Sequence, residues 1–252
     1  MSDFNRNVAA RGGFAGGVAA VDAGLRAYML RVYNYMAAAV ALTGVVAYAT
    51  FSAAVVTDAG GKITALTPFG QAIFSGPLMI VLLLGTLGLV FFISFRISHL
   101  QYTTALTLFM VYAALLGVTV SSIFLAYTGA SITRVFFISA ASFGALSLYG
   151  YTTQRSLSAM GSFMVMGLFG LIIASLVNLF LASSALQFAI SVIGVGVFAG
   201  LTAWDTQRIK EMYDSMDDDG TLGRKAVMGA LSLYLDFINL FLMLLRLVGD
   251  RR

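Results

Sequence analysis

The fold is decided by residues 226–248, which read AVMGALSLYLDFINLFLMLLRLV. As a helix rising 1.5 Å per residue, this stretch is about 35 Å long, enough to cross a hydrocarbon layer of about 30 Å. Asp236 stands in the middle of it, where burying a carboxylate costs about 2.5–3.5 kcal/mol. Packing alone gives no reason to accept that cost. We therefore predict a membrane-spanning helix in which Asp236 has a function.

The composition of the whole chain is that of an integral membrane protein. Of its 252 residues, 60% are hydrophobic and 10% are charged, whereas a soluble domain carries about 25% charged residues. The chain has no cysteine, which excludes disulfides, thiolate catalysis and cysteine-bound metals. The formal net charge of +4 is typical of a protein that retains lysine and arginine on the cytoplasmic side of a membrane. We expect no nucleic-acid partner.

Six further apolar segments precede the last one, so we predict an all-α membrane protein with seven transmembrane helices. Residues 1–27 contain glycine and arginine but no long apolar core. They are expected to form a flexible cytoplasmic tail, and residues 28–252 the membrane domain. A polar link is expected at 57–71 and a densely charged loop at 208–225. The predicted spans are 28–56, 73–95, 102–127, 135–151, 160–182, 186–206 and 226–248.

The distribution of basic residues predicts the orientation. With the N-terminus in the cytoplasm, ten of the fifteen lysines and arginines fall on the cytoplasmic side, as the positive-inside rule requires. A re-entrant last helix would also return the terminal arginines to the cytoplasm. Seven full crossings remain the preferred arrangement, because the last apolar stretch is long enough to span. The ten are Arg6, Arg11, Arg26, Arg31, Arg96, Arg155, Arg208, Lys210, Arg224 and Lys225.

Only two acidic residues lie in or against an apolar helix. Asp205 ends the sixth span at its cytoplasmic side, and Asp236 lies within the seventh. Ser232, Asp236 and Asn239 are four and three residues apart, so they share one helical face. Such a polar stripe faces protein or water rather than lipid. The last helix is therefore expected at the centre of the bundle or along a cavity, with Ser232 and Asn239 supporting its lining.

The loop between the last two spans makes them antiparallel, which allows Asp205 and Asp236 to meet. Two close carboxyl groups in a low dielectric share one proton and titrate as a pair. Such a pair is a proton-sensitive latch and, when doubly ionised, a cation site. Arg96, at the end of the second span, is the candidate counter-ion. Two plainer interpretations stay open: Asp205 and Asp236 satisfy helix ends and backbone, and Arg96 is a positive-inside anchor.

Other chemistry finds no support in the sequence. His99 is the only histidine, and a lone loop histidine is seldom a metal ligand. Asp217, Asp218 and Asp219 are consecutive, so they lack the alternating spacing and closing glutamate of an EF-hand. The chain shows no Ser/His/Asp order, no metal-binding histidine pair and no P-loop. We expect neither an enzyme nor a resident cofactor.

Three segments resemble the transmembrane Bax inhibitor motif family. They are LSLYLDFINLF at 231–241, WDTQRIK at 204–210 and GYTT at 150–153. The resemblance implies six helices around a central seventh, and a proton-sensitive aspartate pair beside a pore that leaks calcium. By motif the pair falls on Asp205 and Asp236, and the latching arginine on Arg96. The glycine-rich start and the lack of cysteine resemble bacterial members, which implies the cell (inner) membrane.

The preferred hypothesis is therefore a passive, pH-sensitive calcium leak channel. Asp205 and Asp236 are its sensor and a transient calcium site, and calcium is the permeant ion. Membrane lipid and protons are its other partners. One alternative is an interaction protein that modulates a membrane protease or cell-death and stress machinery through a membrane-protein partner. Another is a proton-coupled cation antiporter that uses the same two acids.

Overall fold

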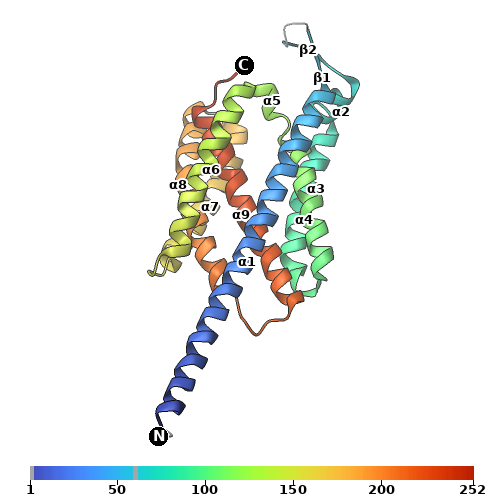
Figure 1. Cartoon of the computed structure of the whole chain (residues 1–252). Helices are drawn as coiled ribbons and strands as arrows, with labels where there is room; N and C mark the ends of the chain where they lie inside the picture. Colours follow the sequence, from blue (N-terminus) through green and yellow to red (C-terminus); the bar gives the residue numbers. More distant parts are fainter. Residues whose placement is uncertain (1–2, 59–61) are drawn as a thin grey trace.

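The structure is a computed structural model (Figure 1) that describes the backbone of residues 3–58 and 62–252 and the side chains of residues 23–58 and 62–252. Within those residues it is an all-α bundle with one two-stranded hairpin. The helices are α1 (Asp3–Ala54), α2 (Pro68–Phe74), α3 (Pro77–Arg96), the 3-10 turn η1 (Ile97–His99), α4 (Tyr102–Val120), α5 (Ile123–Ala126), α6 (Gly129–Thr152), α7 (Ser158–Leu181), α8 (Ser184–Glu211) and α9 (Asp219–Val248). The strands are β1 (Val55–Thr57) and β2 (Ile63–Leu66).

The prediction of seven transmembrane helices is confirmed. Seven described helical segments are long and apolar enough to cross a membrane. Each overlaps one predicted span, and their ends differ by several residues. The segments are Ala23–Ala54, Pro77–His99, Tyr102–Ala126, Gly129–Thr152, Ser158–Leu181, Ser184–Glu211 and Asp219–Val248.

The second span starts later than predicted because the chain breaks at Gly76. Pro77 follows as the first residue of α3, a position where the missing backbone N–H of proline is not needed. The residues before the break form the separate helix α2, whose N-terminus is capped by the Thr67 side chain. The predicted polar link at 57–71 therefore contains ordered structure, namely the β1–β2 hairpin and the start of α2.

The third span is interrupted near its end. The Ser121 hydroxyl donates to the Val118 carbonyl over 2.6 Å, and the chain bends between α4 and the short α5. By hydropathy, Tyr102–Ala126 is a single apolar segment, so the sequence did not predict this interruption.

The first helix begins well before the predicted span. Its backbone is helical from Asp3, so residues 3–27, predicted to be a flexible tail, form the first part of α1. Residues 1–2 and the side chains of residues 3–22 lie outside the described residues. In Figure 1 the N-terminal part of α1 extends beyond the other helices.

The last helix is the most buried of the seven spans. In its most apolar stretch of 18 residues, 67% is buried, whereas the corresponding stretches of the other spans are 39% buried or less. It packs directly on α1, α4, α6 and α8, while α3 packs mainly on α4 and α7 mainly on α8. Four of the six other spans thus form the close contacts of α9, and the remaining two lie outside them.

The last helix also crosses the whole bundle. Its 30 residues correspond to about 45 Å of helix, and the start of α1 and the C-terminus lie at opposite ends of the molecule (Figure 1). After α9 the chain pairs with the segment before α6 through a bridge between Tyr127 and Arg251. This geometry is that of a full crossing and not of a re-entrant segment.

Candidate functional site

A tight connection positions α8 and α9 side by side and antiparallel. Residues 212–218 join them, which is shorter than the predicted loop because both helices extend into it. Asp218 caps α9, accepting hydrogen bonds from the N–H groups of Gly220 and Thr221 over 2.9 and 3.2 Å. Lys225 forms a 2.5 Å ion pair with Asp217 and holds the loop against the first turns of α9. This short connection sets the register of the two helices.

The structure brings the two predicted aspartates together. The Asp205 and Asp236 carboxyl groups lie within hydrogen-bonding reach of each other across the α8–α9 interface. Two carboxyl groups can form such a bond only when one of them carries a proton. Asp236 is buried, with 5% of its surface exposed, and Asp205 is half-buried. The geometry therefore suits a carboxyl pair that shares one proton.

One oxygen of this pair receives no hydrogen bond from a backbone N–H or a hydroxyl group of the described residues. Oδ2 of Asp236 is buried and accepts no hydrogen bond within the described part of the chain. A buried polar atom without a partner costs about 1–3 kcal/mol, and such exceptions in a native fold call for an explanation. Apart from the Asp205 carboxyl group, the described residues therefore offer this oxygen no hydrogen-bond partner.

A chain of hydroxyl groups reaches the neighbour of Asp205. Tyr33 of α1 bonds Ser147 of α6 over 2.6 Å, and Ser147 bonds Thr206 of α8 over 3.0 Å. Thr206 also donates to the Thr202 carbonyl over 2.8 Å. Sequence reasoning missed this network, since serine and threonine within apolar helices commonly bond their own backbone and give no pattern that singles these residues out.

The structure does not bring Arg96 to the pair. Its side chain is exposed at the end of α3, and neither of the two salt bridges formed by described side chains, Arg134–Asp250 and Lys225–Asp217, involves it. The cation whose charge acts on Asp205 is Arg208, which lies over the Trp204 ring at 5.5 Å. The i, i+3 spacing of Asp205 and Arg208 was visible in the WDTQRIK segment.

The remaining predicted residues, Ser232 and Asn239, lie on the same face of α9 as Asp236. Ser232 and Asn239 are both half-buried. The Asn239 amide donates to the Leu235 carbonyl over 2.8 Å, so it satisfies its own helix. Their part in a pore lining stays a prediction. Within the described residues, no three acidic, histidine or cysteine side chains gather in a metal-binding cluster.

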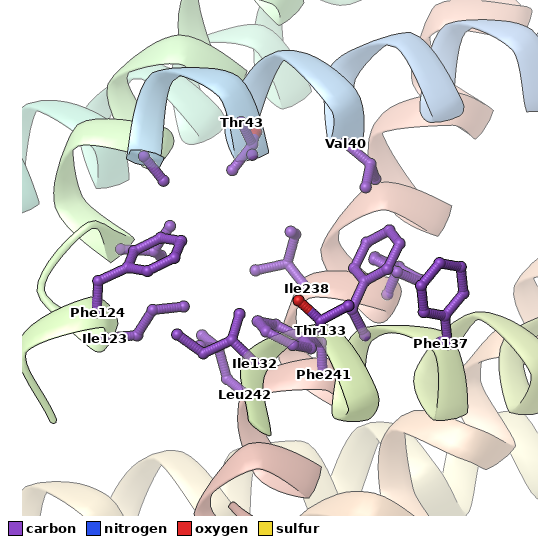
Figure 2. A pocket seen from close by; sticks show the side chains of 15 residues that line it. Val40, Thr43, Ile123, Phe124, Ile132, Thr133, Phe137, Ile238, Phe241 and Leu242 are labelled. Carbon is purple, nitrogen blue, oxygen red and sulfur yellow. The ribbon is translucent and has the colours of Figure 1, made fainter. Parts of the chain in front are cut away.

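An apolar cavity of about 340 Å³ lies beyond the pair, between α1, α6 and α9. Figure 2 shows the rings of Phe124, Phe137 and Phe241 around it. Thr43 and Thr133 are the only lining residues with polar side chains, and the Thr43 hydroxyl is already bonded to Tyr234 over 2.7 Å. This lining offers no carboxylate ligand for a cation.

Comparisons with known proteins agree with this architecture. The family model described as inhibitor of apoptosis-promoting Bax1 matches residues 25–252. The chain is 53% identical over 231 residues to an uncharacterized protein of Rickettsia prowazekii, covering 92% of each chain. It is 47% identical over 234 residues to the inner membrane protein YbhL of Escherichia coli K12, covering 91% of this chain and 94% of the relative. The match covers the whole membrane domain and its seven spans. This chain therefore belongs to the Bax inhibitor-1 family of integral membrane proteins.

Proposed function

We propose that this protein is a pH-sensitive leak pathway for calcium in a bacterial inner membrane, gated by the carboxyl pair Asp205 and Asp236. The observation that carries the proposal is the close approach of these two carboxyl groups, one of them deeply buried, across two membrane-spanning helices. A relative that is 47% identical is an inner membrane protein, which supports the location.

The shared proton gives the pair its sensitivity to pH. Removing that proton leaves two like charges in contact, which repel strongly in a low dielectric. Adding a second proton removes the charge that strengthens the bond. Either change weakens the contact between α8 and α9, so the packing of the central helix depends on pH. The doubly ionised pair also offers oxygen ligands to a passing calcium ion.

Ion flux from purified protein in liposomes tests the proposal. Calcium entry, measured with an enclosed dye, should vary with pH for the wild type. It should lose that variation in Asp236→Asn and in Asp205→Asn, which cannot share a proton as two carboxyl groups do. Asp219→Asn is the matched control, because Asp219 is an exposed carboxylate at the start of the same helix. Unchanged pH dependence in both pair variants would refute the gate.

The same assay separates a leak from an exchanger. A proton-coupled antiporter moves calcium against its gradient when a pH gradient is imposed, whereas a leak only follows the calcium gradient. We expect the imposed pH gradient to drive no uphill calcium movement. Uphill movement would identify the antiporter that the same two acids could serve.

A second candidate function rests on the part of α1 that extends beyond the bundle. A helix that leaves the membrane domain offers a surface to a membrane protease or to stress machinery. On this alternative, deleting residues 1–20 abolishes the cellular phenotype, and the purified protein carries no calcium. A deletion that leaves both the phenotype and the flux intact argues against it.

A further inference from the structure

A cleft of about 650 Å³ separates α1 from α6 at one end of the bundle. The two helices are not among the pairs that pack closely together. Each supplies one wall, α1 from Arg26 to Tyr33 and α6 from Phe143 to Tyr151. The volume lies in the range of about 300–1,000 Å³ that is common for small-molecule sites.

The cleft starts at the membrane boundary and runs into the hydrocarbon layer. Tyr151 lies one residue before the end of the fourth span, where α6 ends, and Arg26 lines the same end of the cleft from α1. Arginine and tyrosine are typical of the headgroup level of a bilayer. Tyr33, the last cleft residue of α1, is about 10 Å deeper at the rise of an α-helix.

The walls of the cleft are apolar and face outward. Leu30 and Leu148 are 53% and 63% exposed within membrane-spanning helices, so lipid tails are the medium around them. At the inner end the hydrogen bond between Tyr33 and Ser147 joins the two walls, which satisfies the hydroxyl groups there. A cleft that opens sideways into hydrocarbon is filled by hydrocarbon, because water has too few polar partners in it.

A positive charge stands at the mouth. The Arg26 side chain is exposed, and among the described residues it takes part in neither salt bridge. A guanidinium group is well suited to bind phosphate through two parallel hydrogen bonds. The charge at headgroup level and the apolar cleft below it match the two halves of one molecule.

We propose that the α1–α6 cleft is a binding site for a membrane phospholipid, with its phosphate at Arg26 and an acyl chain between the helices. The lipid fills the space where α1 and α6 do not pack on each other. It lies against Ser147, whose hydroxyl bonds Thr206 beside Asp205. Lipid occupancy is therefore coupled to the helix that carries one member of the carboxyl pair. The binding site itself stands without the proposed leak activity.

Native mass spectrometry of the protein purified from membranes in mild detergent tests the site. The wild type should retain one phospholipid. Gly144→Leu should lower the retained fraction about tenfold, because Gly144 lines the cleft and its Cβ position has open space around it. Gly85→Leu is the matched control: this glycine is also exposed in a span, also has open space, and lies outside the cleft. Thermal unfolding of each variant checks that the fold is intact.

Substitution of Arg26 at the mouth of the cleft gives a second, independent test. Arg26→Gln should lower phospholipid retention about tenfold, and Arg26→Lys should recover part of it, while added inorganic phosphate should displace nothing. Three results would overturn the proposal. The first is phospholipid retention that is unchanged in both Gly144→Leu and Arg26→Gln, and the second is a loss of phospholipid in Gly85→Leu equal to that in Gly144→Leu. The third is a wild-type dimer without bound lipid that Gly144→Leu converts to monomer. The last result would assign the face to a second copy of the chain.

Discussion

Thr43 of α1 and Tyr234 of α9 are joined by a buried hydrogen bond of 2.7 Å between their hydroxyl groups. The Thr43 hydroxyl also lies 2.9 Å from the Ala39 and Ala113 carbonyls. The Thr43 hydroxyl has a single proton, which it donates to these carbonyls. The Tyr234 hydroxyl is therefore the donor in its bond with Thr43. Thr43 thus ties α9 to α1 and α4 at Tyr234, two residues before Asp236.

The first prediction concerns this tie. Tyr234→Phe should destabilise the protein by about 1 kcal/mol, because it removes one buried hydrogen bond and leaves the ring in place. The measurement is thermal unfolding in detergent. Tyr149→Phe is the matched control, since Tyr149 is 52% exposed on α6. Equal effects of the two substitutions would show that the bond contributes nothing to stability.

The second prediction concerns the contact of α6 with α8. A Cβ atom on Gly150 would lie 2.1 Å from the Ala203 carbonyl oxygen, so Gly150→Ala must push the two helices apart. We expect a loss of about 1–3 kcal/mol, the usual cost of overpacking a well-packed site. Gly144→Ala, on the same helix but in open space, should unfold at the wild-type temperature. Wild-type stability of Gly150→Ala would contradict the close approach.

The sequence predicted the number and order of the spans because each is a long apolar segment between polar breaks. It also predicted that Asp205 and Asp236 meet, since a short connection makes their helices antiparallel. It did not predict the break at Ser121, where a local hydrogen bond interrupts one apolar segment. It also did not predict that the polar link would hold the β1–β2 hairpin. These details depend on backbone geometry that hydropathy does not record.

The arginine latch shows a different limit. Placing Arg96 near the pair requires the packing of α3 against the other helices, which no local pattern in the sequence contains. The structure packs α3 mainly on α4 and leaves Arg96 exposed. Arg208 is fixed by helix geometry alone, one turn from Asp205, and was predictable on that ground. The spacing of residues within one helix thus identified a cation beside Asp205, whereas the position of an arginine on another helix could not be predicted in this way.

The third prediction uses the cap of α9. The Thr221 hydroxyl and the N–H groups of Thr221 and Gly220 donate to Asp218 and, with the nearby charge of Arg224, hold the pKa of its carboxyl below the usual value of 3.8. A depressed pKa contributes stability that is present above the unfolded-state value and is lost as the pH falls through the folded-state value. Above about pH 5, Asp218→Asn should therefore be less stable than the wild type.

The difference between the two proteins should shrink as the pH falls below about 4, because the wild-type carboxyl then takes up its proton. Thermal unfolding measured across pH gives this comparison. Asp219→Asn is the control, as its exposed carboxylate is the next residue of the chain. A stability difference that stays constant with pH would show that the ionised cap is not the source of the effect.

The fourth prediction concerns orientation. The chain has no cysteine, so single cysteines can be labelled without background. Ala65→Cys in β2 and Gln154→Cys between α6 and α7 place exposed thiols at opposite ends of the bundle. With the N-terminus in the cytoplasm, a membrane-impermeant maleimide applied to spheroplasts should label the Ala65→Cys variant and spare the Gln154→Cys variant. The reverse pattern would place the N-terminus outside.

The last prediction sets Arg208 against Arg96. Arg208→Gln should shift the pH at which calcium flux changes, because the charge of Arg208 acts on Asp205. Arg96→Gln should leave that pH unchanged, since the Arg96 side chain is exposed and forms neither of the salt bridges found among described residues. Arg208→Lys keeps the charge and should behave like the wild type in its pH response. A shift in Arg96→Gln alone would show that α3 moves toward the pair when the protein conducts, and would restore Arg96 as the latch.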